Sequence, residues 1–177
     1  MNKFTKGLAA LTLSIFGFSA VSFAQASATA TAEAIVVTPI AITRTVDMNF
    51  GNVAVNANGG TVVLAPSNAA RTVSANGVVL PSTTGTVTAA SFTVTGQAGY
   101  TFAITLPNNA TPTTLTRVNG NGESMTVNAF TSFPSGVGTL TGGTQVVNVG
   151  ATLNVGNTQA AGQYLSGTPF SVTVVYN

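Results

Sequence analysis

Apolar and polar residues alternate along much of this chain, and the alternation is clearest over residues 162–177, GQYLSGTPFSVTVVYN. One face of this stretch carries Phe170, Val172, Val174 and Tyr176, and the other carries Ser171, Thr173 and Asn177. A period of two predicts a β-strand with one buried face. Because the strand reaches the last residue, we expect neighbouring strands to complete a sheet around it.

Shorter alternating runs upstream predict further strands. The first is Ile35–Val37, which Pro39 interrupts because proline lacks the backbone donor of a sheet ladder, and the alternation has resumed by Ile42. A β-hairpin is expected over residues 91–106, where two alternating runs flank the turn sequence Gly96-Gln97-Ala98-Gly99.

The fold class follows from the whole pattern. After the first two dozen residues no stretch shows the apolar spacing of a helix. About ten short strands separated by Gly, Asn and Pro predict an all-β fold, a sandwich or a barrel of antiparallel strands. Any helix is expected to be a single turn.

Residues 1–24 have the composition of a secretory signal peptide. Lys3 and Lys6 precede an uncharged apolar run over residues 7–21, and Ser22-Phe23-Ala24 offers small residues where a signal peptidase cuts. The run is shorter than the ~20 residues that span a bilayer, which favours cleavage over an uncleaved anchor. We therefore expect an exported protein, in the periplasm, on the cell surface or outside the cell, with no membrane span after cleavage.

Cleavage after Ala24 changes the charge balance, because it removes both lysines. The mature net charge is zero, since the charged residues that remain are Arg44, Arg71, Arg117, Glu33, Asp47 and Glu123. Nucleic-acid binding needs a clustered basic surface, which three scattered arginines do not provide. A surface with so few charges favours a protein that packs against copies of itself.

The residue inventory argues against catalysis. The chain has no histidine and no cysteine, and it keeps no lysine after cleavage, so the usual general base, thiol nucleophile and Schiff-base amine are missing. Glu33, Asp47 and Glu123 are the only carboxylates, and each lies at a predicted strand start or turn, where a solvated acid is expected. We expect no enzyme activity, no catalytic or cofactor-binding residue, no cofactor and no metal site.

Residues 25–34 precede the first predicted strand and alternate alanine with small polar residues. A flexible terminus and an extended arm whose alanine face lies in a groove are both compatible with this pattern. The expected organisation is thus a signal peptide over residues 1–24, an N-terminal arm over residues 25–34 and one β-sandwich domain over residues 35–177.

Three stretches carry a resemblance to known proteins: the ending GQYLSGTPFSVTVVYN, the opening Ile35–Ile40, and Asp47-Met48-Asn49-Phe50-Gly51. They resemble a secreted bacterial family known only as a domain of unknown function, similar to spore-coat-protein-U and chaperone–usher fimbrial subunits. The resemblance implies an immunoglobulin-like sandwich that lacks one strand. It also implies a periplasmic chaperone, an usher, and completion by the N-terminal arm of another subunit through strand addition.

The sequence therefore predicts a non-enzymatic, exported structural protein, a fimbrial or coat-like surface subunit that self-assembles by strand addition. The alternative is a complete, monomeric β-sandwich module that binds a glycan or a partner protein. This alternative stays open because the arm is rich in alanine and the chain lacks the disulfide common in fimbrial subunits. The candidate assembly residues are Ala26, Ala28, Ala30 and Ala32 in the arm and Phe170, Val172, Val174 and Tyr176 in the acceptor.

Overall fold

The computed structural model describes residues 24–74 and 77–177, and the chain divides between Ile35 and Val36 into two units. The predicted signal peptide lies outside the described residues, except for Ala24. Residues 24–35, which include the predicted arm, form no strand and have exposed side chains. No helix among the described residues is long and apolar enough to cross a membrane.

The described residues of the second unit, 36–74 and 77–177, form β-strands and a single 3₁₀ turn, η1, over Thr141–Gly143. Its strands, in the described part of the chain, are β1 Ala41–Val46, β2 Ala54–Val55, β3 Gly60–Leu64, β4 Arg71–Ser74, β5 Val78–Val79, β6 Ala90–Thr95, β7 Thr101–Thr105, β8 Thr113–Arg117, β9 Ser124–Phe133, β10 Val137–Thr139, β11 Thr144–Val155, β12 Tyr164–Ser166 and β13 Thr173–Tyr176.

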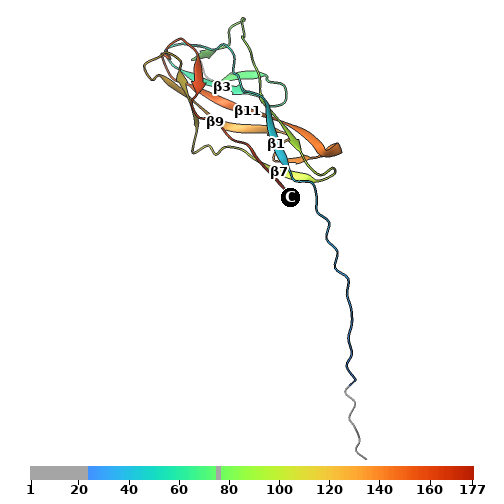
Figure 1. Cartoon of the computed structure of the whole chain (residues 1–177). Coiled ribbons are helices and arrows are strands. Elements are labelled where there is room, and N and C mark those ends of the chain that lie inside the picture. Colours follow the sequence, from blue (N-terminus) through green and yellow to red (C-terminus); the bar gives the residue numbers. More distant parts are fainter. Residues whose placement is uncertain (1–23, 75–76) are drawn as a thin grey trace, which may run out of the picture. The chain divides into compact units, whose positions relative to one another are not determined.

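These strands form one large and two small antiparallel sheets (Figure 1). The large sheet has the order β1-β6-β11-β9-β8-β12, with β3 and β4 joined to β11. The second sheet has the order β10-β7-β13, and β2 pairs with β5 in the third. The predicted all-β sandwich is therefore confirmed.

Strand β11 organises the large sheet. It pairs with β6 over its first half and with β3 over its second half, while β9 pairs along its opposite edge. Its inward residues are Val147, Val149, Ala151, Leu153 and Val155, all buried, as strict alternation requires. Strand β11 therefore joins β3, β6 and β9 in one sheet.

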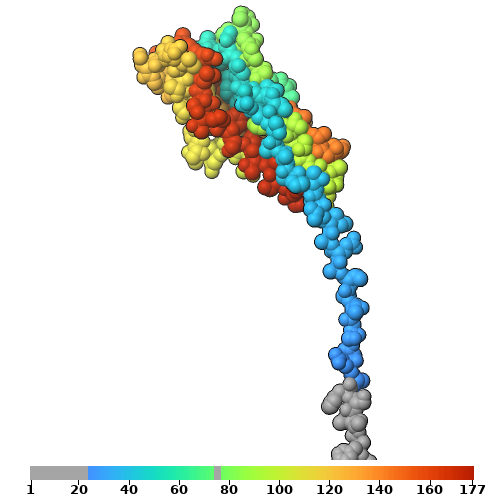
Figure 2. Space-filling view, in the orientation of Figure 1, coloured from blue at the N-terminus to red at the C-terminus, as the bar shows by residue number. Residues whose placement is uncertain are grey.

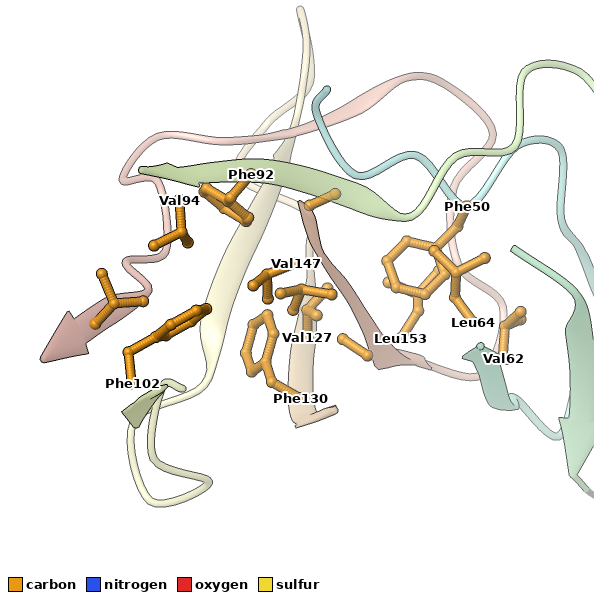
Figure 3. Close-up of a cluster of buried hydrophobic side chains, with 14 of the residues drawn as sticks. Phe50, Val62, Leu64, Phe92, Val94, Phe102, Val127, Phe130, Val147 and Leu153 are labelled. Carbon is orange, nitrogen blue, oxygen red and sulfur yellow. The ribbon is translucent and has the colours of Figure 1, made fainter. Parts of the chain in front are cut away.

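The core lies between the inward faces of the sheets (Figure 3). Phe102 of β7 and Leu140 before η1 are fully buried, together with Val94 of β6 and Val147 of β11. Phe50, which lies outside any named strand, belongs to the same cluster. Apolar burial of this kind is the main source of stability in a fold without disulfides.

Three details of the predicted strands are wrong. Residues 35–37 form no strand, and the first strand starts at Ala41. The described residues hold thirteen strands, more than the ten or so expected. The two strands of the predicted 91–106 hairpin exist as β6 and β7, but they do not pair, because β6 joins the large sheet and β7 the small one.

Candidate functional site

Strand β13 has one open edge. It pairs with β7 in register, from Thr173 opposite Thr105 to Tyr176 opposite Phe102, and no other described strand pairs with it. The N–H of Asn177 donates to the carbonyl of Thr101 at 3.2 Å, which makes these two residues a hydrogen-bonded pair. Because such pairs alternate in antiparallel sheets, the backbone groups of Val174 and Tyr176 point away from β7. They face the open edge.

The large sheet also has an open edge, since β1 pairs only with β6 among the described strands. The cyan residues of β1 and the red C-terminal residues lie on one face of the domain in Figure 2. At one end they are tied by the Tyr176 hydroxyl, which donates to the carbonyl of Thr38 at 2.7 Å. The two open edges therefore flank the same side of the sandwich.

A groove with a volume of about 1440 Å³ opens on the large sheet. Its first rim runs from the last residue of β1 through β2, residues 46–55, and its second rim is formed by residues 159–166 with Pro169 and Phe170. The second rim leads directly into β13. The groove thus lies where the curled sheet leaves a gap between its first and last strands.

The floor of the groove is apolar and is formed by inward side chains of β6, β8, β9 and β11. These residues are Phe92, Leu115, Met125, Val127, Leu153 and Val155. Leu115 and Met125 remain partly exposed, whereas Val127 is only 4% exposed. Phe92, Leu153 and Val155 are also buried, so the apolar surface that the groove offers comes from Leu115 and Met125. Concave sites with an apolar lining are typical of binding grooves.

The first rim is held in place by Arg71 of β4. One guanidinium nitrogen, Nη1, donates to the carbonyls of Phe50 and Asn52, each at 2.7 Å. Gly51, between these two residues, has φ +66°, and a Cβ there would lie 2.3 Å from the carbonyl oxygen of Thr84. The rim is therefore preformed by a charge-assisted clamp and a tight backbone contact.

We expect Arg71→Ala to lower the free energy of unfolding by about 2 kcal/mol, because it removes two hydrogen bonds from a charged donor. Arg44→Ala is the matched control, since the Arg44–Asp47 ion pair is exposed and contributes ~0–1 kcal/mol. Urea unfolding of both variants measures the difference. Equal losses in the two variants would show that Arg71 does not hold the rim.

The second rim has its own polar support. The hydroxyl of Tyr164 donates to the carbonyl of Ala160 at 2.7 Å and accepts from the amide of Gln159 at 2.8 Å. Behind this rim, Arg117 forms an ion pair with Glu123 at 2.9 Å. Backbone N–H donors, its own and that of Asn121, lower the pKa of the Glu123 carboxyl, and Arg117 lowers it further. The carboxylate of Glu123 is therefore engaged in structural hydrogen bonds and an ion pair.

The structure places the candidate acceptor residues at different points. Phe170 lines the groove and packs against Phe92 and Phe130, with ring centroids 6.4 and 4.8 Å apart. Val174 is 8% exposed and belongs to the core, while Val172 and Tyr176 are half-buried against it. The arm residues Ala26, Ala28, Ala30 and Ala32 are exposed and form no strand.

Most of the groove is absent from the sequence-based candidate set. Its floor comes from β6, β8, β9 and β11, of which only β8 and β9 are consecutive in the chain, and nothing in their order indicates that they surround one opening. Two signals were present, because the family-like stretch Asp47–Gly51 forms part of the first rim and the family-like ending, residues 162–177, contributes to the second. Within the described ranges, 24–74 and 77–177, no three Asp, Glu, His or Cys side chains group as metal ligands.

A family model described as "Domain of unknown function (DUF4402)" matches residues 40–176. This range starts just before β1 and ends with β13, so it takes in the groove and both open edges. No curated protein and no solved structure matches the chain.

Proposed function

The chain belongs to the DUF4402 family, and from its groove we propose that it is an exported, non-enzymatic structural protein that assembles by β-strand addition on the cell surface. The observations that carry the proposal are the open edge of β13 and a groove with an apolar floor, whose second rim ends at Phe170 shortly before β13 begins. This proposal agrees with the resemblance of residues 47–51 and 162–177 to fimbrial and spore-coat subunits.

A strand laid along this edge gains two kinds of contact. The outward N–H and C=O groups of Val174 and Tyr176 offer backbone hydrogen bonds, each with a net stabilisation of roughly 0.5–1.5 kcal/mol. The apolar floor takes side chains from one face of the added strand, because successive residues point to opposite sides. Strand addition makes the backbone hydrogen bonds and the apolar side-chain contacts at the same time.

We propose the N-terminal arm of a second copy as the occupant. Residues 25–34 offer an alanine face and an opposite face of Ser, Thr and Glu, so only one face is apolar. Fully extended, these residues span roughly 33 Å at ~3.3 Å per residue. The arm is followed by Ile35 and Val36, which are 82% and 96% exposed. These two side chains add apolar area that the alanines lack.

The groove also explains why we propose that the subunit binds partners before it assembles. A subunit with an unfilled groove leaves Leu115 and Met125 of its floor partly exposed to water, and exposed apolar surface favours aggregation. A periplasmic chaperone that covers the floor until an usher joins the subunits removes this exposure. Export through the signal peptide over residues 1–24 places the subunit in that compartment.

The test compares the chain from residue 25 with a chain from residue 35. Size-exclusion chromatography and electron microscopy are expected to show oligomers only when the arm is present. A peptide of residues 25–38 should bind the shortened chain one to one and raise its melting temperature, because a ligand stabilises the state that it binds. A peptide of the same composition in scrambled order is the control.

Identical monomers with and without the arm, even after incubation with a cognate chaperone, would contradict assembly. Such monomers, together with reversible binding of a glycan, would favour the alternative of a complete binding module.

A further inference from the structure

The hydroxyl of Tyr176 connects three segments of the domain. It donates to the carbonyl of Thr38 at 2.7 Å and accepts from the backbone N–H of Gln97 at 2.6 Å. The side-chain Oε1 of Gln97 accepts from the N–H of Thr38 at 3.3 Å and from its hydroxyl at 3.2 Å. Thr38 is therefore held through its N–H, its C=O and its side chain.

The backbone beside the Tyr176 hydroxyl leaves space for it. A Cβ at position 96 would lie 2.2 Å from the Tyr176 hydroxyl, so only glycine leaves the space. The ring of Tyr176 also packs edge-on against Tyr100, with centroids 5.6 Å apart. We call this set, Tyr176 with Thr38, Gln97 and Gly96, the root latch, because Thr38 is the root from which the arm extends.

The residues around the root resist a reversal of the chain. Ile35, Val36 and Val37 are β-branched, and Thr38 precedes Pro39, which holds it in the extended region. Tight hairpin turns need residues that accept positive φ, most often Asn and Gly. To enter the groove of its own copy, the arm would have to reverse its direction at this segment. The segment is stiff and is anchored at Thr38, so it disfavours the reversal.

We propose that the root latch and this stiff segment reserve the groove for the arm of a second copy by preventing closure within one chain. The inference rests on the proposed function and adds a specificity-determining residue, Tyr176. Closure within one chain is independent of protein concentration, whereas filling by a second copy is favoured by concentration. The two outcomes can be separated by dilution.

The test uses the chain from residue 25, refolded over a range of concentrations. Tyr176→Phe removes the two hydrogen bonds of the Tyr176 hydroxyl but keeps the ring. Val36→Asn with Val37→Gly supplies a hairpin turn. Tyr100→Phe is the control, because Tyr100 packs on the same ring. Chromatography gives the ratio of monomer to oligomer, and cleavage by a Glu-specific protease after Glu33 reports whether the arm is covered.

We expect concentration-dependent oligomers with Glu33 protected for the unmodified chain and for Tyr100→Phe. For Tyr176→Phe we expect the ratio of protected monomer to oligomer to rise at least about tenfold, as the loss of two hydrogen bonds permits. We expect a rise of the same order for the turn variant, because Asn and Gly accept the positive φ of a hairpin turn. If the variants form oligomers like the unmodified chain, or give monomers cleaved at Glu33, the inference about the latch is wrong, while the proposed function still stands. Monomers of the unmodified chain that are cleaved at every concentration would overturn both the inference and the proposed function.

Discussion

Replacing Val174 with aspartate is expected to lower the free energy of unfolding by about 3 kcal/mol or more. Val174 is 8% exposed on the inward face of β13, and no arginine or lysine among its described core neighbours can pair with a new carboxylate there. Both the lost apolar burial and the unpaired charge act in the same direction. Thermal unfolding should show a melting temperature lower by roughly 6–12 °C.

Val175→Asp is the matched control, because Val175 lies on the same strand but is 52% exposed on the outward face. Its melting temperature should change little, since exposed substitutions usually stay within about 0.5 kcal/mol. A Val174→Asp variant as stable as the control would show that this face of β13 is not part of the core.

Two aspartates on the alanine face of the arm, Ala28→Asp with Ala30→Asp, are expected to weaken assembly at least about a hundredfold. In the proposed complex both side chains lie over the apolar floor, where each new charge is buried without a partner. A hundredfold loss corresponds to about 2.8 kcal/mol, which two such charges readily supply. The fold itself should be unaffected, because both alanines are exposed.

The control places the same two charges on the opposite face, as Ser27→Asp with Thr29→Asp. These side chains point away from the floor, so the oligomer fraction at a given protein concentration should stay close to that of the unmodified chain. Equal losses for the two pairs would mean that net charge, and not the face of the arm, controls assembly.

Alternation along the sequence predicts which residues point inward but not which strands become neighbours. Val127, Val174 and Phe102 are buried as the period of two requires. The same period is equally strong in β6 and β7, yet these strands belong to different sheets. The turn between them leads from one layer of the sandwich to the other, and a Gly-rich turn sequence does not distinguish this connection from a hairpin.

The strand predicted at Ile35–Val37 failed for a related reason. A β-branched run favours extended backbone, but a strand forms only where a neighbour supplies hydrogen bonds. Among the described residues none pairs with this run. The proposed function gives these residues a neighbour in another copy, which a single chain does not contain.

The groove was still harder to foresee. Residues such as Leu115 and Leu153 carry ordinary core patterns, and only the curl of the sheet leaves them beside a gap. Tyr176 was selected for its place on a strand face, but its hydroxyl contacts, with Thr38 and Gln97, depend on segments far from it in sequence.

Hydrogen exchange at the amides of Val174 and Tyr176 shows whether a strand adds to the open edge of β13. In the chain from residue 35 both N–H groups face the open edge and should exchange rapidly, whereas the N–H of Val175, directed at β7, should be protected. After addition of the peptide of residues 25–38, the account predicts strong protection of Val174 and Tyr176 and little change at Val175. Unchanged exchange at these two amides at saturating peptide would contradict strand addition at β13.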